Sequence, residues 1–98
     1  MREGLTKNWT KLQRCAGSFN GYAVTGFQFQ APDGEIGWFI TAWPHQDPIH
    51  DYWVHGNKFY NVTPHLDPRS KFEIFDEVKK LDPAEKKAIL EAIEEWET

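Results

Sequence analysis

The chain has 98 residues, a formal net charge of −4 at pH 7 and one cysteine, Cys15. A chain of this length builds one small hydrophobic core, so we expect a single domain over residues 1–98 without a deep substrate cavity. The mild acidity argues against a strongly basic nucleic-acid binder, a single cysteine excludes an intrachain disulfide, and no stretch reaches the roughly 20 apolar residues of a membrane helix. With no signal-peptide pattern at its start, we expect a cytoplasmic protein that does not bind membranes.

The N-terminal segment predicts a short helix over residues 5–15. Three apolar side chains fall on one helical face: Leu5, Trp9 and Leu12. Three basic side chains fall on another face: Lys7, Lys11 and Arg14. Gly17 and the Asn20-Gly21 pair are expected to end this helix.

The next segment predicts a β-hairpin. Residues 22–30 (YAVTGFQFQ) and 36–43 (IGWFITAW) are rich in aromatic and β-branched side chains, and they flank a Pro-Asp-Gly turn. The alternation of apolar positions slips at Gly26, because Val24 and Phe27 have opposite parity. A β-bulge at Gly26 would reconcile the two halves of the strand.

Residues 51–62 (DYWVHGNKFYNV) predict a second hairpin with a two-residue turn at Gly56-Asn57. Both turn residues tolerate the positive φ angles that such a turn requires. The expected register places Trp53 opposite Tyr60 and His55 opposite Lys58. This register would create a stabilising aromatic contact across the two strands.

The last third predicts two helices. The first would begin at the capping box Ser70-Lys-Phe-Glu73 and extend to residue 81. The second would begin at Asp82-Pro83, with proline at the first helical position, and would pack with a stripe of Ile89, Ala92, Ile93 and Trp96. The expected fold class is α+β: a small antiparallel sheet of about four strands in two hairpins, two C-terminal helices packed on it, and a short N-terminal helix.

The strand over residues 36–43 is apolar on both faces, and two or three short helices seldom cover both faces of a sheet. Some aromatic side chains should therefore remain at the surface, where they mark a contact for another protein or for a second copy of the chain. We accordingly expect a small non-enzymatic binding module that needs no cofactor and acts as a regulator, an inhibitor or an immunity-type protein. The expected aromatic anchors are Trp38, Trp43, Trp53 and Tyr60. The hairpin tip would add His55 and Lys58, and the acidic C-terminal helix would add Glu94 and Glu95.

A metal site, which could serve hydrolysis, is the first alternative. All four histidines lie between residues 45 and 65, and the phrases Pro-His-Gln-Asp-Pro and Pro-His-Leu-Asp-Pro occur there. The candidate ligands are His45, Asp47, His50 and His65. His45, His50 and His55 are five residues apart. This spacing places successive side chains about 140° apart on a helix, so the three would not share a helical face. An Asp-Pro pair is also a common turn device, which favours a structural role for both phrases.

Binding of single-stranded nucleic acid is the second alternative. The basic N-terminal segment could contact phosphates while aromatic rings stack on bases. The candidate residues are Lys7, Trp9, Lys11 and Arg14. The acidity of the whole chain argues against this interpretation.

Overall fold

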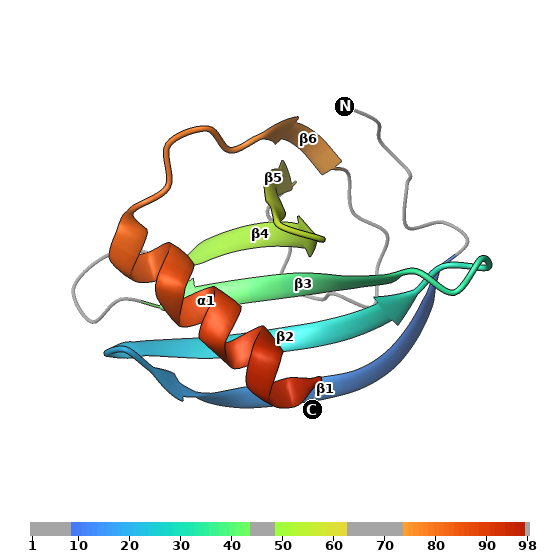
Figure 1. The fold of residues 1–98 in the computed structure, drawn as a ribbon, viewed down its shortest axis with the longest axis horizontal. Coiled ribbons are helices and arrows are strands. Elements are labelled where there is room, and N and C mark those ends of the chain that lie inside the picture. The colour runs from blue at the N-terminus through green and yellow to red at the C-terminus, as the bar shows by residue number, and fades with distance from the viewer. Residues whose placement is uncertain (1–8, 44–48, 63–73, 98) are drawn as a thin grey trace.

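The computed structural model describes residues 9–43, 49–62 and 74–97, and these ranges form one six-stranded antiparallel sheet crossed by one helix (Figure 1). Each strand pairs with its neighbours in sequence, so the sheet is a simple meander in the order β1-β2-β3-β4-β5-β6. The strands are β1 Thr10–Phe19, β2 Tyr22–Gln30, β3 Ile36–Trp43, β4 His50–His55, β5 Lys58–Val62 and β6 Ile74–Glu77. The helix α1 spans Pro83–Trp96 and packs against β1, β2 and β3.

The class α+β is correct, but the predicted arrangement of four strands and two C-terminal helices is wrong. The described residues contain six strands and a single helix. The two additional strands, β1 and β6, are the two edges of the sheet.

The predicted N-terminal helix is wrong over residues 10–15, which belong to β1; residues 5–8 lie outside the described ranges. β1 pairs with β2 from Thr10 opposite Gln30 to Phe19 opposite Tyr22. The connecting turn places Asn20 and Gly21 at φ angles of 51° and 84°, which suit a tight hairpin. The helical spacing was misleading because Leu12 lies at an irregularity between Lys11 and Gln13 and is 47% exposed.

The helix predicted from residue 70 to residue 81 is wrong over residues 74–81: residues 74–77 form β6, and residues 78–81 are not helical. Ser70 and Glu73 of the expected capping box lie outside the described residues. β6 pairs with β5, and the backbone N–H of Val78 extends this pairing by donating to the carbonyl of Phe59 at 2.7 Å. The open edge of β5 therefore offers backbone partners that outweigh a local helical preference.

Both predicted hairpins are confirmed. β2 and β3 are joined by a loop at residues 31–35, and β4 and β5 pair with Trp53 opposite Tyr60 and His55 opposite Lys58. The bulge predicted at Gly26 is wrong, because the register between β2 and β3 is unbroken. The change of parity has another cause: Val24 packs in the layer beneath the helix, whereas Phe29 packs in a layer on the opposite face.

The sheet carries an apolar layer on each face. The layer beneath α1 is the larger one, and it contains Val24, Trp38, Ile40, Ala42, Tyr52, Val54, Phe59, Ile89 and Ala92. The opposite layer contains Phe29, Phe39, Trp53 and Val62, with Trp9, Phe27 and Tyr60 packed against it. The predicted start of α1 is confirmed, with proline in its first turn after Asp82.

Each face of the sheet has one glycine that leaves space for a tryptophan ring. A Cβ atom at Gly37 would lie 2.2 Å from Cζ2 of Trp53, and a Cβ atom at Gly26 would lie 2.6 Å from Cζ3 of Trp96. Neither distance is compatible with non-bonded carbon atoms. The two tryptophan rings therefore pack directly on the backbone of β3 and β2.

We predict that Gly37→Ala destabilises the protein by about 1–3 kcal/mol, because Trp53 is also enclosed by Trp9 and Phe29 and cannot move aside. Gly26→Ala should also destabilise the protein, because its Cβ atom would lie 2.6 Å from Trp96 and 3.0 Å from the buried side chains of Ile40 and Trp38. Urea unfolding of the two variants and the wild type gives the comparison. A neutral Gly37→Ala variant would contradict this packing.

Candidate functional site

An exposed apolar surface lies where β3 ends and β4 begins. Trp43 is 54% exposed and Ile49 is 52% exposed. The last paired residues of these two strands are Ala42 and His50, so Trp43 and Ile49 are the next residues on either side. By strand alternation Trp43 lies on the face opposite α1, the face that also carries Phe39. We call Trp43 and Ile49 the Trp43 patch.

The other three expected anchors are not comparably exposed. Trp38 is 2% exposed beneath α1, and Trp53 is 3% exposed in the opposite layer. Tyr60 is half-buried opposite Trp53. Trp38 also donates its indole N–H to Oε2 of Glu97 at 2.8 Å, so its polar atom is satisfied internally. Among the four anchors, all within the described residues, Trp43 is therefore the one with more than half of its surface exposed.

Polar and aromatic contacts fix the tip of the β4–β5 hairpin. Nε2 of His55 lies 2.7 Å from Oε1 of Glu35, which joins the β4–β5 hairpin to the loop before β3. The ring of Trp9 makes edge contacts with Trp53 and His55, at centroid distances of 5.2 and 5.9 Å. His55 is thus half-buried and engaged, whereas Lys58, its cross-strand neighbour, is exposed.

The acidic end of α1 lies away from the Trp43 patch. Glu94 and Glu95 are exposed, and the last turn of this helix contains no basic residue. The helix end lies beside Trp38, which precedes Trp43 by five residues, or about 17 Å along β3. An open depression of about 480 Å³ adjoins this end and is lined by Gln13, Gln28, Ile36, Trp96 and Glu97.

A buried carboxylate joins the first turn of α1 to β4. Glu85 is 3% exposed, and its Oε2 lies 2.9 Å from Nδ1 of His50. The hydroxyl of Tyr52 donates to the same carboxylate. Desolvation, followed by the negative charge and hydrogen bond of Glu85, raises the pKa of Tyr52 far above its ordinary value of 10.0.

Glu85 is not among the residues expected to be functional, although the sequence carries a signal for it. Glu85 precedes Ile89 by four residues, so it falls on the apolar stripe of the helix. A carboxylate on that stripe must be buried and therefore requires partners. The stripe could not indicate that His50 and Tyr52 would be those partners.

The structure places one of the four candidate metal ligands, His50, and gives it a carboxylate partner. His45, Asp47 and His65 lie outside the described residues. Within the described ranges, no three histidine, cysteine or acidic side chains gather as a metal site would require. A histidine oriented by a carboxylate resembles an acid–base pair, but its Glu85 partner also serves to attach the helix to the sheet.

The structure places three of the four candidate nucleic-acid residues, Trp9, Lys11 and Arg14. The ammonium group of Lys11 lies 5.2 Å from the centroid of the Phe27 ring, and Trp9 packs against Trp53. Arg14 is exposed on β1, and Lys7 lies outside the described residues. Burial raises the pKa of the Cys15 thiol on the same strand, which disfavours its reactive thiolate form.

The chain matches no known family model, no curated protein and no solved structure at a significant level. α1, the helix of the described part of the chain, is too short and too polar to cross a bilayer.

We predict that alkaline pH destabilises the wild type through Tyr52. The folded-state pKa of Tyr52 is raised, so its stabilising contribution is complete below about pH 10, the unfolded value, and is lost as the pH rises further. The slope attributable to one proton is at most about 1.4 kcal/mol per pH unit. Urea unfolding between pH 8 and pH 11 should show this slope in the wild type and a shallower one in Tyr52→Phe. Parallel curves for the two proteins would contradict the buried Tyr52–Glu85 contact.

Proposed function

We propose that this protein is a small non-enzymatic binding module, of the regulator, inhibitor or immunity type, that docks on another protein through the Trp43 patch. The observation that carries this proposal is the 54% exposure of Trp43 beside Ile49, which is 52% exposed. An indole ring supplies a large contact area at low cost in side-chain entropy, which is why tryptophan is enriched among interface hot spots. The adjacent hydrogen bond from Thr41 to Asp51, at 3.0 Å, provides a rigid polar border on the same face.

The acidic end of α1 supplies a separate, electrostatic contribution from outside the Trp43 patch. It lies beyond direct reach of a side chain that contacts Trp43, since the two are about 17 Å apart along the sheet and on different faces. Its contribution is therefore to attract a partner with basic groups, rather than to pack against the same side chains.

We predict that Trp43→Ser lowers partner affinity at least tenfold and leaves the fold intact, because the ring is half exposed and does not belong to either core layer. Leu12→Ser is the matched control, since Leu12 is also a large exposed apolar residue but lies on β1. Quantitative pull-downs with wild type and both variants identify the partner, and titration of the purified partner gives the affinities. Sedimentation at increasing concentration tests whether the partner is a second copy.

The outcome is decisive in both directions. Loss of the partner in Trp43→Ser but not in Leu12→Ser supports the Trp43 patch. Equal binding by all three folded proteins contradicts it. Binding that disappears with chelator would instead indicate the metal alternative, and binding to single-stranded nucleic acid that falls steeply with salt would indicate the nucleic-acid alternative.

We predict that the double variant Glu94→Gln/Glu95→Gln slows association with the partner several-fold at low salt and changes dissociation little. Exposed charges that do not touch the partner act mainly on the rate of encounter. Surface plasmon resonance at two ionic strengths separates the two rates, and the difference between variant and wild type should shrink at high salt. An increased dissociation rate alone would show that these side chains touch the partner directly.

A further inference from the structure

Within the described part of the chain, β1 leaves one long backbone edge of the sheet open (Figure 1). β1 has ten residues, whereas β6 at the other edge has four. Beyond the irregularity between Lys11 and Gln13, the pairing with β2 is unbroken from Gln13 to Phe19. This stretch contains neither proline nor lysine, the residues that commonly protect an edge strand. It can therefore accept a further strand.

The two-residue turn after β1 determines which residues direct their backbone groups outward. Such a turn is closed by a hydrogen-bonded pair, here Phe19 with Tyr22, so Phe19 directs its N–H and C=O toward β2. Because this direction alternates along an antiparallel strand, Ser18, Ala16 and Arg14 direct theirs away from β2. All three are exposed.

The outward residues carry their side chains on the face opposite α1. Arg14 pairs with Phe27, which packs against the apolar layer of that face. Ala16 and Ser18 follow at alternate positions and share this face. An antiparallel added strand would therefore place its paired side chains beside one arginine and two small residues.

The bulge in β1 brings a second cation to this face. Leu12 is the extra residue, so Lys11 and Arg14 share a face although they are three positions apart. Lys11 pairs with Phe29, and its ammonium group lies 5.2 Å from the centroid of the Phe27 ring. Neither β1 nor β2 contains an acidic residue. This face of the edge is therefore positively charged.

The α1 face of the same edge has the opposite charge. Gln13 pairs with Gln28, and both line an open depression together with Trp96 and Glu97 at the end of α1. The last turn of this helix contains no basic residue. An added strand would meet cations on one face and carboxylate groups on the other.

We propose that β1 binds an extended segment of another protein in which acidic residues alternate with uncharged ones. The segment runs antiparallel to β1 and places its acidic residues opposite Arg14, Ala16 and Ser18. Its backbone hydrogen bonds supply affinity, and the two cations select the acidic side chains. β1 of a second copy is itself basic and offers no such counter-charge. This binding does not depend on the Trp43 patch, which offers an aromatic ring rather than backbone groups.

The test is an NMR titration of the folded protein at low salt with seven-residue peptides that have blocked ends. The peptide TETETET should give saturable shifts at the amides of Arg14, Ala16 and Ser18. TKTKTKT should bind at least tenfold more weakly, because it places like charges beside the two cations. N-methylation of the three glutamates in TETETET should abolish binding, since their N–H groups pair with β1, whereas N-methylation of its threonines should weaken binding much less.

Variants of the protein separate charge from backbone pairing. Arg14→Gln should weaken TETETET about threefold, and Lys58→Gln is the matched control, since Lys58 is an exposed cation on β5. Ala16→Pro should weaken the peptide at least tenfold, because it removes an outward N–H and no bond to β2. Trp43→Ser should leave the peptide affinity unchanged, so failure of this proposal and failure of the Trp43 patch are distinguishable. The amide spectrum of each variant verifies its fold.

Shifts that do not saturate, equal affinity for TETETET and TKTKTKT, or equal effects of the two N-methylated peptides would overturn the proposal. Equal weakening by Arg14→Gln and Lys58→Gln would also contradict it. Shifts of the same amides with protein concentration alone would assign the edge to a second copy instead. Saturable shifts there with a single-stranded oligonucleotide, and none with TETETET, would assign it to nucleic acid.

Discussion

The rest of this structure depends on the packing of a tryptophan against a glycine on each face of the sheet. Trp53 packs on Gly37 of β3 from one side, and Trp96 packs on Gly26 of β2 from the other. Because neither glycine has a Cβ atom, each indole approaches the backbone closely, Trp53 within its layer and Trp96 at the margin of the other. Two apolar layers therefore form on this sheet, although one helix covers only one of its faces.

This packing limits what the protein offers to a partner. Aromatic residues on both faces would suggest a sheet with an extensive exposed apolar surface, but most of these side chains are enclosed in the two layers. Trp43 lies outside both layers because it occupies the last position of β3, where it contacts neither α1 nor the opposite layer that contains Trp53. A small exposed patch at a strand end favours a specific contact over indiscriminate association.

The elements that could be predicted from sequence are those whose signals are local. The Gly56-Asn57 turn determined the register of β4 and β5, and Asp82-Pro83 with the stripe through Ile89 determined α1. β1 and β6 could not be predicted in this way, because an edge strand is defined by the backbone of its neighbour and its own side chains need not alternate. The same limit applies to the site: the apolar character of both faces of β3 left the exposure of Trp43 undetermined, and only tertiary structure brings Glu85 to His50.

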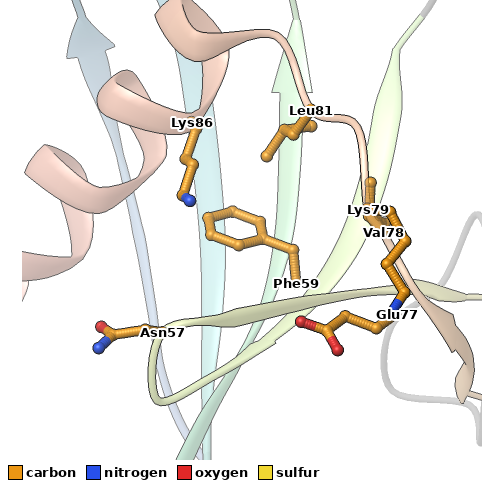
Figure 2. Close-up of a pocket in the computed structure, with 7 residues that line it drawn as sticks. All are labelled: Asn57, Phe59, Glu77, Val78, Lys79, Leu81 and Lys86. Atoms are coloured by element: carbon orange, nitrogen blue, oxygen red, sulfur yellow. The ribbon is translucent and has the colours of Figure 1, made fainter.

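The buried Glu85 carboxylate connects the fold to the cavity of about 120 Å³ that Phe59, Glu77 and Lys86 line beside the β4–β5 turn (Figure 2). Burying a charge is unfavourable unless it is well bonded, and here His50 and Tyr52 supply two partners from β4. Two further contacts fix the same helix end, from Tyr22 to Asp82 at 3.0 Å and from Asn20 to the Ala84 carbonyl at 3.2 Å. Lys86 follows directly in this restrained turn, so the position of its backbone above Phe59 is set by bonds on the other side of the helix. The buried Glu85 side chain therefore does more than attach α1 to the sheet. It also holds the wall of the cavity that α1 forms at a fixed distance from the β4–β5 hairpin.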